Sequence, residues 1–422
     1  MLFFLAIILF GQAQAQSASA YINDIDKLYA TIKKLPSYKD QIKDDRKIEF
    51  EKRYNELRQD TSNLKSDDVV FSRMTRLLFP LKDNHIGYHQ SLSLYPNKSN
   101  LADGDFIKKY KASDAFINYQ RTNLNVDSLR QALTIKLKDD VEGIYYYENY
   151  LTVGLFRTAK KDSLIGVVLT TSMPTWEKGQ IAMRMYEYGP NKFRAIYSHP
   201  LYKMLIYYAN EKFARQSLLN SYFYSSVSEM VYSKNPWEIN HVDIPTTDPP
   251  FQFKTINKNI QYIHLGNFSS YPAEMVKSED FYNQIRDSLK APNLIVDMRN
   301  NTGGGEKVSG KFLKLLKKYA DKGSMYIVIN NGTISQGERF VLSLKKLKNI
   351  TVLGETTQGK IAYGSNSDKT ITLPSGKSAI YITDMKDPDN YLDYEDIGIN
   401  PDVYLATYKD WVPQVVELIN KK

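Results

Sequence analysis

The stretch NLIVDMRNNTGGGEKVSGKFLKLLKKYA occupies residues 293–320. It opens with the apolar run LIV and passes through three consecutive glycines. Apolar residues then recur at three- and four-residue spacing. A short apolar run bounded by a turn is typical of a buried strand, and the later spacing is typical of an amphipathic helix. The stretch therefore predicts a strand, a glycine turn and a helix in succession.

The same alternation continues through the last part of the chain. Strand-like runs IQYIHLGNF, SMYIVIN and ITVLGET alternate with helix-like runs EDFYNQIRDSLK and QGERFVLSLKKL. Strands and helices that alternate at these lengths predict a largely parallel α/β layer structure. The turn-forming sequence TTDPP at residues 246–250 marks where this region begins.

The earlier parts of the chain have different periods. Residues 21–80 carry apolar residues at helical spacing, whereas residues 140–200 contain short β-branched and aromatic segments separated by turns. The second pattern predicts an antiparallel sheet or small barrel. We therefore expect four parts, listed in chain order: a signal peptide (1–15), an N-terminal helical region (16–97), a β-rich middle domain (98–245) and an α/β domain (246–422).

The expected signal peptide rests on the apolar run LFFLAIILF and on Ala13-Gln14-Ala15, which fits an A-x-A cleavage site. The run is short for a membrane span. The chain has no cysteine, which excludes disulfides and thiolate zinc sites. We expect an exported protein, periplasmic or secreted, without stable membrane insertion.

The net charge of +9 comes from lysines scattered through helix-like runs such as KFLKLLKKYADK. This distribution is typical of solvated helix faces. A nucleic-acid interface would instead show a dense basic stripe with interleaved aromatic residues. We therefore expect no nucleic-acid partner.

Gly303, Gly304 and Gly305 allow the backbone to turn sharply and to direct N–H groups outward. Such a turn can hold an anion or a developing oxyanion, but it can equally be a flexible connection. It has neither the Gly-Lys-Ser/Thr of a P-loop nor the spaced glycines of a dinucleotide fingerprint. No cofactor is indicated.

Ser335 stands between the strand-like run MYIVINNG and the helix-like run QGERFVLSLKKL. Serine at this position is either an ordinary helix N-cap or a nucleophile. The helix N-terminus would stabilise negative charge near the seryl oxygen, and the N–H of Gln336 could serve as an oxyanion donor.

A nucleophilic serine needs a base. His85, in LKDNHIGYH, follows a helix at a polar break, and Lys360, in LGETTQGK, is a second candidate if desolvation lowers its pKa. His85 and His89 are four residues apart, as in a helical metal pair. Gly87 between them and the lack of a third ligand argue against a metal site, so we expect no metal.

Five segments occur in one order: IVDMRNNTGGG, VINNGTISQGE, VLGETTQGK, LPSG and GINPDV. Together they resemble the serine peptidases that include the C-terminal processing peptidases and the tricorn protease core, over about residues 255–405. The resemblance implies a ClpP/crotonase-like catalytic domain that hydrolyses polypeptide substrates through a seryl acyl-enzyme, without a cofactor.

The resemblance also implies roles for individual residues. Ser335, with Glu338 three residues later, matches the nucleophile motif. Gly303 and Gly304 fall in the loop that supplies an oxyanion donor, and the Gln336 N–H is its partner.

Two branches of the family use different bases. In the processing-peptidase branch a lysine follows the serine by 25 positions, and 360 − 335 = 25 places Lys360 there. That branch also has a glutamine four residues beyond the lysine, where this chain has Gly364.

In the tricorn-like branch the base is a histidine from the N-terminal helical part, which matches His85. Its orienting glutamate is best matched by Glu395 in YEDIGINPDV, although Asn84 stands where tricorn has a serine. We favour Ser335 with His85 and Glu395.

Residues 98–245 show no sign of the PDZ domain of the processing peptidases. VEGIYYYENYLTVGLFR is instead similar to the opening of a small β-barrel in exported tricorn-like peptidases. Two other readings stay open: a non-catalytic ligand- or peptide-binding protein on the same fold, and acyl-thioester chemistry, which an exported location disfavours. The sequence predicts no oligomeric state.

Overall fold

The computed structural model describes residues 18–64, 66–389 and 391–421. By contact, the chain divides into two compact units: Met1–Trp237 with Ser365–Met385, and Glu238–Gly364 with Lys386–Lys422. The domain boundaries expected near residues 97 and 245 stay predictions. The expected signal peptide, residues 1–15, lies outside the described residues.

The first unit starts with the predicted helical region. It contains a helix over residues 18–32, then α2 (Pro36–Gln41), α3 (Asp44–Gln59) and α4 (Asp67–Thr75). Short helices also occur at the start of the expected β-rich middle domain: η1 (Lys98–Asn100), α5 (Gly104–Lys111), α6 (Asp114–Ile117) and α7 (Val126–Thr134). A side-chain N-cap starts each of the last three: Asp103, Ser113 and Asn125.

The first unit also holds a ten-stranded sheet. Its strands are β1 (Gly87–Gln90), β2 (Gly143–Tyr147), β3 (Leu151–Arg157), β4 (Ser163–Thr171), β5 (Ile181–Gly189), β6 (Lys192–Ser198), β7 (Leu205–Ala214), β8 (Ser217–Leu218), β15 (Thr370–Thr372) and β16 (Ser378–Tyr381). They follow the order β15-β16-β1-β7-β6-β5-β4-β3-β2, with β8 on β7. Every pairing is antiparallel, which confirms that part of the prediction.

Further backbone hydrogen bonds join the strands at the far end of this sheet. Tyr146 of β2 and Ser233 exchange backbone hydrogen bonds of 2.7 and 3.0 Å, and Leu218 N–H of β8 donates to Tyr232 O at 2.9 Å. Residues 232–233 therefore join β2 to β8. Because β8 pairs with β7, this segment connects the first and last strands of the β2–β7 run.

Aromatic side chains fill the interior of the β2–β8 region. The fully buried rings, each at most 1% exposed, include Tyr145, Tyr147, Phe193, Tyr197, Phe223 and Tyr232. Burying a large apolar side chain contributes about 1.5–3 kcal/mol. Tyrosines of this region therefore form part of its core.

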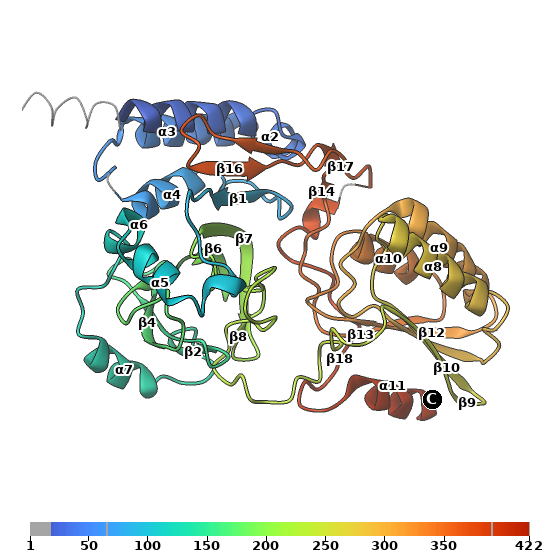
Figure 1. The fold of residues 1–422 in the computed structure, drawn as a ribbon. Helices are drawn as coiled ribbons and strands as arrows, with labels where there is room; N and C mark the ends of the chain where they lie inside the picture. Colours follow the sequence, from blue (N-terminus) through green and yellow to red (C-terminus); the bar gives the residue numbers. More distant parts are fainter. Residues whose placement is uncertain (1–17, 65, 390, 422) are drawn as a thin grey trace, which may run out of the picture. The chain divides into compact units, whose positions relative to one another are not determined.

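The second unit is built on a six-stranded sheet (Figure 1). Its strands are β9 (Phe251–Asn257), β10 (Ile260–Leu265), β11 (Asn293–Asp297), β12 (Ser324–Ile329), β13 (Ile350–Gly354) and β18 (Val403–Tyr404). The order is β18-β13-β12-β11-β10-β9, and all pairs are parallel except β9 with β10. The predicted largely parallel α/β structure is confirmed.

Helices cover both faces of this sheet, as Figure 1 shows. One face packs against α8 (Pro272–Ile285), α9 (Glu306–Ala320) and α10 (Gln336–Lys345), and the other against α11 (Trp411–Asn420). Successive residues of β11 point to opposite faces, so Leu294 joins the first core and Ile295 the second. The remaining elements are β14 (Tyr363–Gly364), which pairs with β17 (Met385–Lys386), and η2 (Tyr391–Asp393).

The topology determines where a site can form. Because β11, β12 and β13 are parallel, the loops that follow them leave the same edge of the sheet. These loops contain the glycine turn, Ser335 and Lys360. Among the described residues, no helix is both long and apolar enough to cross a membrane.

Candidate active site

The turn between β12 and α10 has an unusual backbone at Ser335, with φ 55° and ψ −123°. Two ordinary polar N-caps of this chain, Ser113 and Asn125, have φ values of −75° and −67°. A residue other than glycine in such a conformation costs about 1–3 kcal/mol, and such residues cluster at functional sites. Ser335 therefore forms a capping box with Glu338 but lacks the ordinary N-cap backbone conformation, and it sits on a strained strand-to-helix turn, as serine nucleophiles do in other hydrolases.

Backbone hydrogen bonds place Lys360 next to this turn. Ser335 N–H donates to Lys360 O at 2.9 Å and to Glu338 Oε2 at 3.1 Å. The Lys360 N–H donates to the same Glu338 oxygen at 3.0 Å. The structure thus brings the backbones of the two predicted residues together.

The glycine loop packs directly on the Ser335 turn. Gly303 and Gly304 have φ values of 80° and 132°. A Cβ added to Gly303 would lie 2.8 Å from Ser335 Cβ and 2.9 Å from Gln336 N, and one added to Gly304 would lie 2.0 Å from Phe268 O. Side chains are therefore excluded at both positions, and the loop depends on its glycines.

The two glycines use their N–H groups differently. Gly303 N–H donates to Asn301 Oδ1 at 2.9 Å. By contrast, neither Gly304 N–H nor Gln336 N–H donates to any acceptor within residues 18–64, 66–389 and 391–421. Of the residues predicted for the oxyanion hole, Gly304 and Gln336 have N–H groups that can donate to an oxyanion. Gly303 instead leaves room for the Ser335 turn, because it has no side chain.

Asn301 is a structural residue of the site that the sequence did not single out. It is fully buried, its Nδ2 donates to Leu265 O at 2.6 Å, and its carbonyl accepts from Ile334 N–H at 2.9 Å. Asn301 thereby fixes the glycine loop to β10 and to the Ser335 turn. The only sequence signal was the Asn-Asn pair before the glycines.

A second asparagine contact joins the same two loops. Asn330 Nδ2, at the end of β12, donates to Asn300 Oδ1 at 2.8 Å. Thr333 Oγ1 also donates to Met298 O at 2.8 Å. These polar links hold the loops that follow β11 and β12 in one arrangement.

Glu395 lies in the same unit, beside the chain that follows Lys360. It is fully buried, and its Oε2 accepts from the N–H groups of Ile361 and Ala362, both at 2.8 Å. Its carboxylate therefore holds the loop after β13 in place. An orienting role toward a histidine stays a prediction.

His85 lies in the first unit, on the turn before β1. The backbone N–H of His85 donates to Asp83 Oδ1 at 3.3 Å, and Thr383 Oγ1 donates to Asp83 Oδ2 at 2.7 Å. Because Ser335 belongs to the second unit, the pairing of these two residues stays a prediction.

Two other histidines, His199 and His264, are buried packing residues, and His89 is half-buried. Burial lowers the pKa of His199 to about 4, and its Nδ1 accepts from two backbone N–H groups. Burial also lowers the pKa of His264 and of His89. His89 lies in β1 and His85 in a turn, not on one helix, and the described residues contain no group of three or more metal-ligating side chains.

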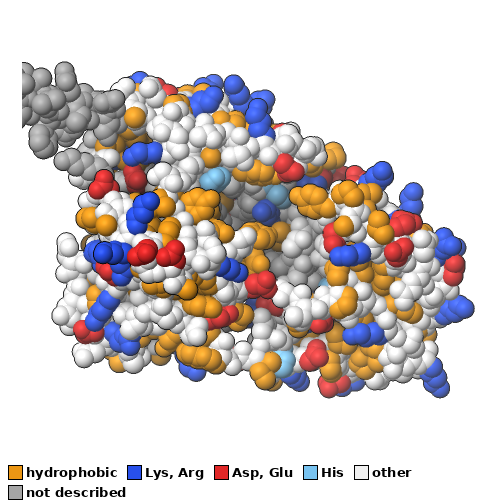
Figure 2. Space-filling view, viewed as in Figure 1, with side chains coloured by type: hydrophobic (Ala, Val, Ile, Leu, Met, Phe, Trp, Pro, Cys, Tyr) orange, Lys and Arg blue, Asp and Glu red, His pale blue; other side chains and the backbone are white. Residues whose placement is uncertain are grey.

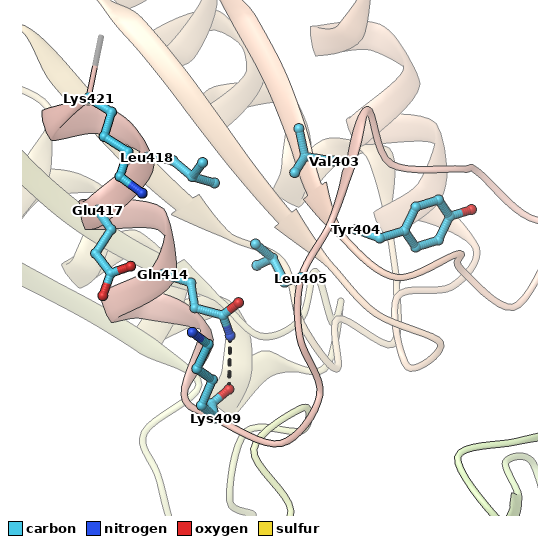
Figure 3. Close-up of a pocket in the computed structure, with 8 residues that line it drawn as sticks. All are labelled: Val403, Tyr404, Leu405, Lys409, Gln414, Glu417, Leu418 and Lys421. Carbon is cyan, nitrogen blue, oxygen red and sulfur yellow. Dashed lines mark hydrogen bonds between the residues drawn. The ribbon is translucent and has the colours of Figure 1, made fainter.

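The surface outside the site shows two relevant features. On the face seen in Figure 2, Lys and Arg side chains are interspersed with acidic and neutral ones. A shallow pocket between β18 and α11 is lined by Tyr404 and Gln414 among others, and Gln414 Nε2 donates to Lys409 O at 3.0 Å (Figure 3). This pocket contains none of the predicted catalytic residues.

Comparison with known proteins gives a family match for part of the chain. Residues 305–405 match the family described as peptidase family S41. The segment contains Ser335, Lys360 and Glu395, and the match confirms the predicted resemblance to this family of serine-type peptidases. No curated protein matches the chain by sequence.

Several solved structures are similar in fold. The photosystem II D1 C-terminal processing protease is 13% identical, with 92% of this chain and 94% of that chain covered and a TM-score of 0.38. Mature CPAF is 10% identical over 96% and 99%, with a TM-score of 0.42. The tricorn protease is 20% identical over 39% of this chain and 18% of its own, with a TM-score of 0.29. These distant similarities assign no role to individual residues.

Proposed function

We propose that this protein hydrolyses peptide bonds of polypeptide substrates through an acyl-enzyme on Ser335. The observation that carries the proposal is the strained backbone of Ser335 beside the N–H groups of Gly304 and Gln336, which donate to no acceptor in the described part of the chain. N–H donors fixed in advance around a developing oxyanion are typically worth 10²–10³-fold in rate each.

The chemistry follows the general acyl-transfer sequence. Ser335 Oγ attacks the peptide carbonyl carbon while a base takes its proton, and the carbonyl oxygen becomes an oxyanion near the Gly304 and Gln336 N–H groups. The base then gives the proton to the leaving amine, and the peptide C–N bond breaks. Water hydrolyses the ester that remains and releases the second product.

We propose His85 as the base, with Glu395 as its orienting carboxylate. The support is the sequence resemblance and the rigid setting of the His85 turn, where Asp83 and Thr383 hold the backbone. The alternative is Lys360, whose support is the hydrogen bond from Ser335 N–H to its carbonyl.

Fluorophosphonate labelling across pH 5–9 distinguishes the two bases. We expect Ser335→Ala and His85→Ala to lower the labelling rate by about 10³-fold or more, and Lys360→Ala to label nearly as the wild type does. The wild-type rate should rise with pH through the range typical of histidine. His89→Ala and Lys346→Ala are matched controls, because both lie outside the proposed machinery. Loss of labelling in Lys360→Ala alone would transfer the role of base to Lys360.

We further propose that the second unit is a ClpP/crotonase-like catalytic domain and that β2–β8 form a barrel-like domain. The parallel order of β10–β13 supports the first, and the backbone hydrogen bonds at Ser233 support the second. The aromatic rings that fill the β2–β8 interior weigh against the alternative of an apolar-ligand-binding barrel.

We also propose that the protein is exported. The support is the apolar N-terminal run with its A-x-A site. Expression in a bacterial host followed by N-terminal sequencing tests this. The proposal expects protein outside the cytoplasm that starts at Gln16, and retention with residues 1–15 intact would contradict it.

A further inference from the structure

Glu338 is a fully buried carboxylate with an unusually complete set of donors. It lies in the first turn of α10 and is 0% exposed. Oε1 accepts from Thr357 Oγ1 at 2.5 Å and from Gly359 N–H at 2.9 Å. Oε2 accepts from Ser335 N–H at 3.1 Å and from Lys360 N–H at 3.0 Å.

These contacts exceed the needs of a helix cap. In a capping box, the acidic side chain at the third helical position returns one hydrogen bond to the N-cap N–H. Here Ser335 N–H donates that bond to Glu338, and three further donors come from residues 357–360, in the loop that follows β13. The carboxylate therefore joins the start of α10 to a second loop that is distant in sequence.

The hydrogen bonds to Glu338 offset the cost of burying its charge and so stabilise this link. A carboxylate is costly to bury unless hydrogen bonds satisfy it, and hydrogen bonds to charged groups contribute about 1.5–3 kcal/mol each. Four donors around Glu338 meet that condition. Because Ser335 holds a strained backbone conformation, a strong local contact has to maintain it.

We infer that Glu338 is a positioning residue that holds Ser335 in its strained conformation and fixes the 357–360 loop against it. The inference deepens the proposed function and rests on it. It holds for either base: if Lys360 is the base, Glu338 positions both reacting residues through their N–H groups, and otherwise it positions the nucleophile alone.

The substitution Glu338→Gln tests this with little change in volume. Each carboxylate oxygen accepts at least one backbone N–H. Either orientation of the amide therefore directs its NH₂ group at a backbone donor. A hydrogen bond to the carboxylate is thereby replaced by repulsion between the amide NH₂ and the backbone N–H, while the side chain stays in place.

Glu211→Gln is the matched control. Glu211 is also fully buried, lies in β7 and is not a member of the proposed machinery. Its carboxylate accepts from the N–H groups of Lys212 and Asn220 and from Tyr197 Oη, each at 2.8 Å. A general cost of replacing a buried, hydrogen-bonded glutamate should appear in both variants.

The measurement is the time course of fluorophosphonate labelling on full-length protein, well below the unfolding temperature. The final extent of labelling reports the folded fraction, and the rate reports the geometry of the site. We expect Glu338→Gln to label about 10- to 100-fold more slowly than the wild type, since small misplacements of reacting groups cost up to about 10²-fold. Glu211→Gln should label at the wild-type rate.

Equal rates for Glu338→Gln and the wild type would overturn the inference while leaving the proposed function intact. If the wild type itself does not label, the proposed function fails and the inference fails with it. Should Glu338→Gln not fold, Thr357→Val removes a single donor to Oε1 at nearly constant volume. A several-fold slower rate in that variant would support the inference, and an unchanged rate would overturn it.

Discussion

The two sheets of this protein use left-handed backbone conformations for different purposes. In the antiparallel sheet, residues with positive φ such as Asn191, Arg215 and Gln216 lie in turns between neighbouring strands, where the hairpin geometry requires them. In the parallel sheet, Ser335 has positive φ between a strand and a helix, where most chains use an ordinary cap. The turns in the antiparallel sheet reverse the chain direction, whereas the Ser335 turn holds a strained backbone at one edge of the parallel sheet.

The buried polar groups differ in the same way. In the antiparallel sheet, Glu211 lies among aromatic core residues and its contacts are complete. In the parallel sheet, Asn301 and Glu338 hold loops whose N–H groups at Gly304 and Gln336 donate to no acceptor in the described part of the chain. Buried polar groups therefore complete a core in one unit and hold donors available in the other.

Gly304→Ala should have the largest effect on the N–H donors that the parallel sheet holds available. The added Cβ would meet the backbone of Phe268 at 2.0 Å, and φ is 132°. We expect at least about 100-fold slower fluorophosphonate labelling, because the loop and its donor must move. Gly310→Ala in α9 is the control, since nothing lies within 4 Å of its added Cβ. It should keep the wild-type rate and raise stability by about 0.4–1 kcal/mol. Wild-type labelling by Gly304→Ala would contradict the assigned oxyanion donor.

Glu211 should give the antiparallel sheet a pH-dependent stability. Burial raises its pKa to about 7, although the hydrogen bonds to its carboxylate oppose the shift. Because the folded state binds this proton more tightly than the unfolded state, its contribution is complete below about pH 4.5 and is lost as pH rises to about 7. The loss should be on the order of a few kcal/mol.

Hydrogen exchange of β6 and β7 amides, corrected for the intrinsic chemical rate, measures this contribution. Protection in the wild type should fall between pH 5 and pH 7, and Glu211→Gln should remove most of that slope. Identical slopes in the two proteins would show that Glu211 keeps an ordinary pKa.

The smallest expected effects on stability concern the two serines that start helices. Ser113 has ordinary cap geometry, so Ser113→Ala should cost about 0.5–1 kcal/mol and leave labelling unchanged. Ser335→Ala should abolish labelling and lower stability by no more than about 1 kcal/mol, since alanine bears the same backbone strain and loses only the hydrogen bond that the Ser335 side chain accepts in the capping box. Chemical denaturation combined with the labelling assay compares the pair. A stability loss in Ser335→Ala that matches Ser113→Ala, with labelling retained, would make Ser335 an ordinary cap.

Local pattern was sufficient to predict the parallel sheet and the order of its loops. Strand, turn and helix follow one another within about 30 residues, so periodicity and turn residues identify them. The same holds for Ser335 at the start of a helix, because the helix-like run starts at Gln336.

Contacts between distant segments could not be predicted from pattern. Residues 365–385 join the first unit, where β16 pairs with β1 and Tyr88 Oη lies 2.9 Å from Ser378 Oγ. Such pairing depends on the whole fold. The different uses of the Gly303 and Gly304 N–H groups also escaped prediction, because they depend on where Asn301 and Phe268 lie.

Mapping of the fluorophosphonate adduct tests the central claim most directly. The labelled, folded protein is digested, and mass spectrometry locates the modified residue. The account predicts one adduct, on Ser335, that is absent when the protein is denatured before labelling. A folded protein that forms no adduct, or forms it on another residue while Ser335 stays unmodified, would contradict the account.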